Sequence, residues 1–131
     1  MKWIETWTKE LVLFLTKIHA LRIYHCDIKP ENIMFRPEKP RKPVLIDFSS
    51  ACTPDFQPFT YLQSRFYRAP EVLLGLKPYG DKIDIWSLGC SLVELYLGLP
   101  LFPGGCSYDQ LSKICRLIPC NCQQTQTRAT R

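Results

Sequence analysis

The chain has 131 residues, which is typical of one domain, and 46% of them are hydrophobic, as in a globular protein. Its net charge is +5, but the basic residues are dispersed apart from segment 36–42 and the C-terminal end. They are not interleaved with aromatic residues as on a single-strand-binding surface, so we expect no nucleic-acid partner. No apolar run approaches the about 18 residues of a membrane span, so we expect no membrane partner either.

Seven cysteines occur at irregular spacing, and their number is odd. This pattern favours free thiols in a reducing compartment, and therefore an intracellular location in the cytoplasm or the nucleus. A zinc site built from Cys115, Cys120 and Cys122 is disfavoured because there is no CxxC pair and both histidines lie far upstream.

In the first half of the chain, apolar residues recur every three or four positions from residue 3 to about 21, which predicts an amphipathic helix. Short β-type runs at 33–35 and 44–46 flank a charged, proline-rich loop and predict a small hairpin. From residue 47 to about 70 there is little periodicity. This segment is predicted to be a long loop, and such loops in compact domains are usually functional or disordered.

In the second half, residues 81–98 predict a helix that is apolar nearly all round, with Ile83 and Trp86 on one stripe and Ile85 and Leu88 on another. Such a helix belongs at the centre of a core. A third helix is expected at about 107–118, with Ser107 as its N-cap. Residues 119–131 are polar and aperiodic, and we expect a disordered tail there.

Three polar residues crowd the loop "YHCDIKPEN" at 24–32: Asp27, Lys29 and Asn32. The predicted hairpin returns the chain to Asp47, which we therefore expect near Asn32. Carboxylate and amide oxygens suit Mg²⁺, a lysine can face a phosphate, and a further carboxylate can accept a hydroxyl proton. The set predicts phosphoryl transfer, although Asp27 and Asn32 taken alone could be turn formers around Pro30.

Four motifs carry a resemblance to protein kinases. The segment "HCDIKPENI" resembles the catalytic loop H-x-D-x-K-x-x-N, "IDFSSA" resembles the metal-binding D-F-G, "RAPE" at 68–71 matches A-P-E, and "DIWSLGC" at 84–90 is similar to D-x-W-S-x-G. Cys26 and the segment "TYLQSRFYRAPEVLLG" at 60–75 resemble the dual-specificity tyrosine-regulated kinases and their homeodomain-interacting relatives. The resemblance covers about residues 3–118. It implies a mainly α fold, the C-terminal lobe of a kinase with a small β-hairpin.

The resemblance also implies roles in catalysis, with ATP and Mg²⁺ as cofactors. Asp27 would be the general base for the substrate hydroxyl, and Lys29 would neutralise the transferring phosphate. Asn32 and Asp47 would hold the metal ions, and Ser64 would touch the catalytic loop.

Further roles concern the segment that follows. Tyr61 matches an activation-loop tyrosine, and Arg65 and Arg68 stand where its phosphate would be received. Asp84 is expected to accept backbone N–H bonds from the catalytic loop, because a buried carboxylate needs such partners. His25 resembles a structural histidine of the family.

The sequence also departs from the family pattern. Ser49 replaces the D-F-G glycine, which weakens the expected activity without removing Asp47. We expect that the N-terminal lobe, which carries the glycine-rich loop and the strand lysine of the family, does not precede the first helix. Residues 1–118 are therefore expected to be a partial kinase domain. The isolated chain is expected to be inactive, to bind Mg-ATP weakly and to expose apolar helix surface that a partner could cover.

Two hypotheses follow. In the first, the chain is part of an ATP-dependent serine/threonine or dual-specificity kinase that acts on protein substrates. In the second, it is a catalytically silent kinase-like module that binds substrates or regulators through residues 61–70 and the third helix.

Overall fold

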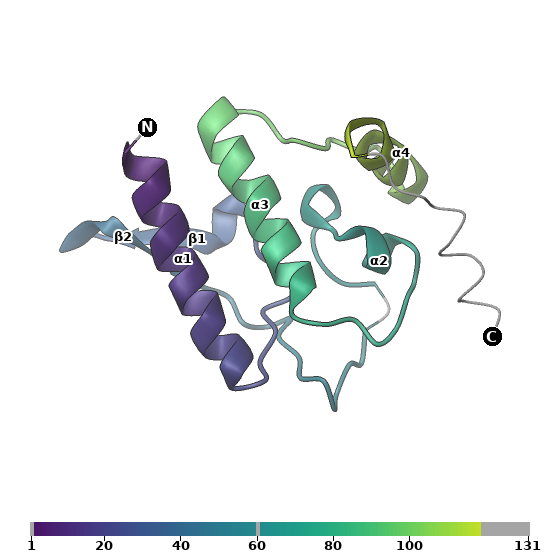
Figure 1. Ribbon diagram of the computed structural model, residues 1–131, viewed down its shortest axis with the longest axis horizontal. Helices are drawn as coiled ribbons and strands as arrows, with labels where there is room; N and C mark the ends of the chain where they lie inside the picture. The colour runs from purple at the N-terminus through teal and green to yellow at the C-terminus, as the bar shows by residue number, and fades with distance from the viewer. Residues whose placement is uncertain (1, 60, 119–131) are drawn as a thin grey trace.

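The computed structural model describes residues 2–59 and 61–118 (Figure 1). Its helices are α1 (Lys2–Ala20), α2 (Pro70–Leu73), α3 (Lys82–Leu97) and α4 (Ser107–Leu117), and its strands are β1 (Ile33–Arg36) and β2 (Lys39–Leu45). Short 3-10 turns cover Pro30–Asn32 and Arg65–Tyr67. The predicted mainly α fold with a small hairpin is confirmed. The predicted tail at 119–131 lies outside the described residues.

Helices α1 and α3 lie side by side, with the hairpin packed against α1 (Figure 1). One core cluster joins these elements to the loop after α1: Leu11, Leu15, Ile18, Ile28, Ile33, Leu45 and Leu88. The middle of the predicted α1 stripe is buried, whereas Trp3 and Leu21 at its ends are 40% and 70% exposed. This packing fixes the loop at 24–32 between the two long helices.

The hairpin is longer than its sequence predicts. The strands are antiparallel with Ile33 opposite Leu45 and Arg36 opposite Lys39, and a bulge lies between Phe35 and Arg36. The proline-rich segment expected to be a loop is therefore mostly strand. In a two-stranded sheet each strand has one free edge, where the missing N–H of a proline costs no ladder hydrogen bond.

Two expectations about the later helices are wrong in detail. Helix α3 is not apolar all round, because its buried face carries Asp84, Ser87 and Ser91 while Ile85 is 43% exposed. The N-cap of α4 is Cys106, whose sulfur accepts from the Asp109 backbone N–H, so Ser107 is the first helical residue. Polar side chains can lie inside a helix bundle where they anchor neighbouring loops, and hydropathy alone does not reveal this.

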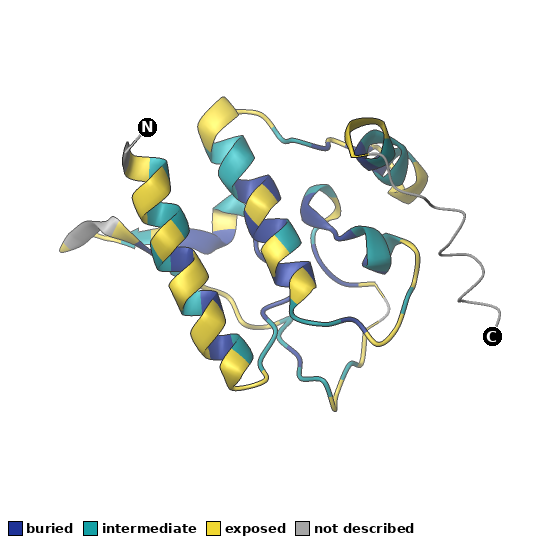
Figure 2. Ribbon diagram, viewed as in Figure 1, coloured by how far each residue is buried: buried dark blue, intermediate teal, exposed yellow. Residues whose placement is uncertain are grey.

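The expected exposed apolar surface is present. Figure 2 shows exposed positions along α1 and at the C-terminal end of α3, and these include Leu13, Tyr96, Leu97 and Leu99. Within residues 2–59 and 61–118, no helix combines the length and the apolarity needed to cross a membrane.

Candidate active site

The loop at 24–32 is held by the backbone at both ends. Tyr24 pairs with Cys52 in an antiparallel bridge, with N···O distances of 2.9 and 3.0 Å, and Asn32 closes a 3-10 turn onto Lys29. Between these points Cys26 has φ = 66°, a left-handed conformation that costs free energy for a residue with a side chain. A loop that keeps such a residue must be fixed by strong contacts.

Asp84 of α3 supplies those contacts. Its carboxylate is fully buried and accepts hydrogen bonds from the backbone N–H groups of His25 (2.8 Å) and Cys26 (2.9 Å). The Nε2 atom of His19 lies 2.9 Å from the same carboxylate and donates to it. Because a buried carboxylate is stable only when it is hydrogen-bonded, these three donors and Asp84 hold each other in place. The result is a fixed backbone immediately before Asp27.

His25 connects this loop to the end of the hairpin. Its Nδ1 accepts from the backbone N–H of Asp27 at 3.3 Å, so its Nε2 carries the proton and donates to the Ile46 carbonyl at 3.0 Å. The ring also packs on Phe48, with centroids 4.6 Å apart. His25 therefore lies between Asp27 and Asp47 with both ring nitrogens engaged, as expected for a structural histidine.

The Asp27 carboxylate lies at the centre of a polar cluster. Its Oδ1 accepts from the Ser64 hydroxyl at 2.8 Å and its Oδ2 from the Lys29 ammonium at 2.8 Å. Lys29 also donates to Ser64 Oγ at 3.1 Å. Partial burial by itself raises the pKa of Asp27, but the hydrogen bonds from Lys29 and Ser64 and the Lys29 charge outweigh it, so the pKa is lowered. Asp27 is therefore ionised at neutral pH.

The hairpin brings Asn32 next to the residue that precedes Asp47. The Ile46 N–H donates to the Asn32 carbonyl at 3.0 Å, which joins the residue before Asp47 to the catalytic-loop segment. The buried Asn32 amide donates to the Asp27 carbonyl at 2.8 Å. Because its nitrogen makes this bond, its side-chain oxygen is the atom that could coordinate a metal ion.

Asp47 itself is exposed and has φ = 63°. Its Oδ1 accepts from both the hydroxyl (2.6 Å) and the N–H (3.2 Å) of Ser49, and these bonds lower the pKa of Asp47. Ser49 is not among the positive-φ residues, so the backbone freedom of a glycine is not needed at that position. Serine instead acts as a hydrogen-bond donor to Asp47.

The oxygen donors of Asn32 and Asp47 fit a hard cation such as Mg²⁺, which also takes ligands from phosphates. In the described part of the chain, no group of three or more His, Cys, Asp or Glu side chains could hold a metal ion. Cys120 and Cys122 lie outside that part, so the expectation of no zinc site stays a prediction.

Tyr61 and Arg68 lie against each other. The Tyr61 side chain is 66% exposed, and the Arg68 guanidinium carbon is 3.8 Å from its ring centroid. Arg68 is buried and donates to the carbonyls of Leu62 and Gln63, while its Nη1 is buried without a hydrogen-bond partner. Arg68, and after it Arg65, lower the pKa of Tyr61 by stabilising the phenolate.

Arg65 also has carbonyl acceptors of its own. Its Nη1 donates to Gly105 at 2.6 Å, across the loop that leads into α4. Arg68 therefore contacts the Tyr61 ring directly, whereas Arg65 donates its hydrogen bonds to the Gly104 and Gly105 carbonyls, in the loop before α4.

Two residues that organise the site were not predicted. Gln63 is buried with φ = 65°, donates to Ile83 and Ser87 of α3, and accepts from the Ala69 N–H. His19, at the end of α1, is the donor to Asp84. The hydropathy pattern does not indicate that a glutamine has a left-handed backbone conformation, and a single histidine on a helix does not indicate its hydrogen-bond partner. Both features therefore become visible only in the folded structure.

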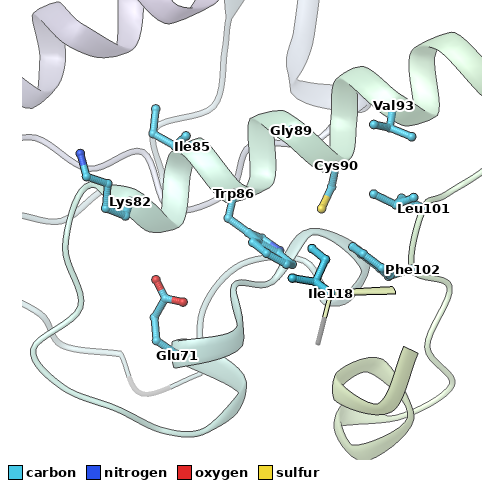
Figure 3. Close-up of a pocket in the computed structure, with 10 residues that line it drawn as sticks. All are labelled: Glu71, Lys82, Ile85, Trp86, Gly89, Cys90, Val93, Leu101, Phe102 and Ile118. Carbon is cyan, nitrogen blue, oxygen red and sulfur yellow. The ribbon is translucent and has the colours of Figure 1, made fainter. Parts of the chain in front are cut away.

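A cavity of about 520 Å³ lies beside α3, away from these residues (Figure 3). In Figure 3 the Trp86 ring points into it next to Phe102, with ring centroids 6.0 Å apart, and Glu71 faces it from α2. Its lining contains none of the predicted site residues. This cavity is therefore separate from the predicted site, whereas a second cavity of about 370 Å³ is lined by Lys29, Ser64 and Arg65.

Comparison with known proteins agrees with the geometry. The protein kinase domain model matches residues 1–130. The chain is 48% identical over 112 residues to the dual specificity protein kinase YAK1 of Saccharomyces cerevisiae, covering 85% of this chain and 14% of that protein. It is 47% identical over 118 residues to the dual specificity tyrosine-phosphorylation-regulated kinase 2 of Drosophila melanogaster, covering 90% and 16%.

A third relative is the DYRK-family kinase pom1 of Schizosaccharomyces pombe, 45% identical over 115 residues, with 88% of this chain and 10% of that protein covered. The chain thus spans about a tenth to a sixth of the length of these relatives. Since the family model covers nearly every residue and these relatives share close to half of the aligned positions, the chain belongs to the protein kinase family, within the group of dual-specificity kinases related to YAK1 and DYRK.

Proposed function

We propose that the chain forms the catalytic-loop part of an ATP-dependent serine/threonine or dual-specificity kinase that transfers the γ-phosphate to protein hydroxyls. The observation that carries the proposal is the Asp27 carboxylate, which is ionised and held by Lys29 and Ser64 on a backbone fixed by Asp84. A base for phosphoryl transfer must be charged and oriented before substrate binds, and this arrangement supplies both.

In the proposed reaction Asp27 orients the substrate hydroxyl and accepts its proton. The Ser64 hydroxyl shows that an O–H group can lie 2.8 Å from the carboxylate. Lys29 would offset negative charge on the transferred phosphate, and its ammonium lies within hydrogen-bond distance of Asp27 and Ser64. Orientation and charge compensation are the two contributions that these residues make.

Asn32 and Asp47 would hold Mg²⁺, which when bound neutralises charge on the ATP phosphates. The Asn32 amide is fixed by hydrogen bonds to the Asp27 carbonyl (2.8 Å) and carboxylate (3.3 Å), so the proposed metal ligand and the proposed base are in direct contact. The hydrogen bonds from Ser49 lower the pKa of Asp47, which favours the ionised carboxylate, the form that binds a cation.

Regulation is proposed to involve Tyr61. Phosphate on this exposed tyrosine would bring negative charge beside Arg68, whose buried Nη1 has no hydrogen-bond partner. A charge-assisted hydrogen bond would satisfy that nitrogen and order the segment from Tyr61 to Arg68. Arg65 would join it by turning from the Gly105 carbonyl.

For the 131 residues alone we propose little or no transfer. They contain no G-x-G-x-x-G phosphate loop, and one side of a nucleotide clamp positions ATP poorly. The proposed substrates are proteins, and the proposed location is intracellular, which the free thiols of the five described cysteines support.

A chimera tests the proposal. Residues 1–118 would replace the matching segment of the Drosophila kinase, to which the chain is 47% identical. We expect the chimera to transfer labelled γ-phosphate to a mixed peptide substrate, and the 131-residue chain alone to transfer none above background. A folded chimera that binds Mg-ATP but leaves every peptide unlabelled would favour a catalytically silent binding module instead.

A further inference from the structure

The Asp47 carboxylate is held by one neighbour, at one of its two oxygens. Its Oδ1 accepts from the Ser49 hydroxyl at 2.6 Å and from the Ser49 N–H at 3.2 Å. A carboxylate oxygen has about two lone-pair sites, so these two donors occupy the sites of Oδ1. Within residues 2–59 and 61–118 the hydrogen bonds to this carboxylate all reach Oδ1. Oδ2 is therefore the oxygen that is open to a ligand.

Ser49 lies in a turn that is itself fixed, although Asp47 and Ser49 are both exposed. The Ala51 N–H donates to the Phe48 carbonyl at 3.0 Å, which closes the turn around Ser49. The Phe48 ring packs against His25, with ring centroids 4.6 Å apart, and both ring nitrogens of His25 are hydrogen-bonded. The contact between Ser49 and Asp47 is therefore set by the packing of the turn.

The number of open carboxylate oxygens affects which cation binds. Ca²⁺ takes about six to eight oxygen ligands and accepts both oxygens of one carboxylate, whereas Mg²⁺ requires near-ideal octahedral geometry and keeps several waters. Coordination through both oxygens of Asp47 would require Oδ1 to give up a Ser49 donor. A carboxylate with one open oxygen supplies a single ligand atom, and this suits Mg²⁺ better than Ca²⁺.

We propose that Ser49 is a positioning residue that limits Asp47 to a single metal–oxygen bond through Oδ2, and thereby shifts the preference of the candidate metal site from Ca²⁺ toward Mg²⁺. This role rests on the proposed function, in which Asn32 and Asp47 hold Mg²⁺. A glycine at position 49, as in the D-F-G pattern, would supply the N–H donor but no hydroxyl. The serine therefore adds the closer of the two donors to Oδ1.

The test measures cation binding by the purified 131-residue chain without nucleotide, so it does not depend on phosphate transfer. Mn²⁺ is the probe, because it takes the same oxygen ligands and its unpaired electrons broaden the NMR signals of nearby nuclei. A small amount of Mn²⁺ is added to isotope-labelled chain and is then displaced with Mg²⁺ or with Ca²⁺. The readout is the ratio of the Ca²⁺ to the Mg²⁺ concentration that restores half of the amide signals of Asn32 and Asp47.

In Ser49→Ala this concentration ratio should fall by about threefold or more, because Oδ1 becomes available to Ca²⁺. Ser49→Thr keeps a hydroxyl and should keep the ratio of the parent chain. Ser50→Ala is the matched control, because it makes the same change at a serine that, in the described part of the chain, donates no hydrogen bond to Asp47. A ratio in Ser49→Ala equal to that in Ser50→Ala would overturn the proposal.

Asp47→Asn separates the role of Ser49 from the proposed function. If Mn²⁺ leaves the signals of Asn32 and Asp47 sharp, or broadens position 47 equally in Asp47→Asn, these residues are not the metal ligands and both proposals about them fail. If the broadening depends on Asp47 but the ratio ignores Ser49→Ala, the metal site stands and only the role of Ser49 is lost. Should Ser49→Ala not fold, Ser49→Gly removes the same hydroxyl and takes its place.

Discussion

Replacing Asp84 by asparagine tests how the loop before Asp27 is held. Oδ1 of Asp84 accepts from Cys26 N–H, and Oδ2 accepts from His25 N–H and His19 Nε2. An asparagine has one oxygen and one NH₂ group, so in either orientation at least one of these donors meets another donor. A buried donor left without an acceptor costs about 1–3 kcal/mol, and the remaining bonds lose their charge assistance.

Together these losses predict destabilisation by about 3–5 kcal/mol for Asp84→Asn, as when a buried charge pair is broken. The measurement is urea unfolding followed by circular dichroism, with exchange of the Cys26 amide proton as a local readout. Asp81→Asn is the matched control, because Asp81 is in the preceding turn, 38% exposed and paired with exposed Lys82, so its change should stay below about 1 kcal/mol. An Asp84→Asn chain as stable as Asp81→Asn would show that the Asp84 carboxylate does not hold the loop.

Three further outcomes are expected. Gln63→Ala should lower the free energy of unfolding by about 2–3 kcal/mol, because it leaves the buried Ala69 N–H without its acceptor and removes the donor to the Ile83 carbonyl and the Ser87 hydroxyl, and a change below about 0.5 kcal/mol would contradict this. Ser49→Gly should raise the pKa of Asp47 toward its ordinary value in a carboxyl NMR titration, because the hydroxyl donor is lost and only the backbone N–H donor remains. An unchanged pKa would show that the hydroxyl bond is unimportant. Burial, and after it Glu94, raise the pKa of Tyr67, so the folded state keeps its proton longer than the unfolded state. Stability should therefore fall as pH rises above about 10, and this part of the fall should vanish in Tyr67→Phe.

Periodicity predicted the helices well because their apolar residues face a common core. The bounds of α1 and α3 were expected within one or two residues, and Leu11 and Ile18 are buried as the pattern required. Hydropathy could not predict the buried face of α3, where Asp84 and Ser87 serve as partners for loops distant in sequence, while Ser91 donates to the Ser87 carbonyl of the same helix. Those loops become neighbours only through the fold.

The site residues were predicted from motif spacing, and the structure brings Asp27, Lys29, Asn32 and Ser64 together. Motif spacing could not predict the contacts of His19 and Gln63, because their hydrogen-bond partners lie in other elements. Motif spacing also does not reveal the hydrogen bonds from Ser49 to Asp47. Serine in place of the D-F-G glycine predicts a loss of backbone freedom, whereas the structure shows an added hydroxyl donor to the Asp47 carboxylate.

Single-turnover phosphate transfer by the chimera measures whether Asp27 acts on the substrate hydroxyl. Asp27→Asn should slow transfer by about 10²–10⁴-fold at saturating Mg-ATP while leaving ATP binding unchanged. Asp55→Asn, a change at a side chain that is 75% exposed, should transfer phosphate at the rate of the parent chimera. Transfer by Asp27→Asn within about threefold of that rate would contradict the account.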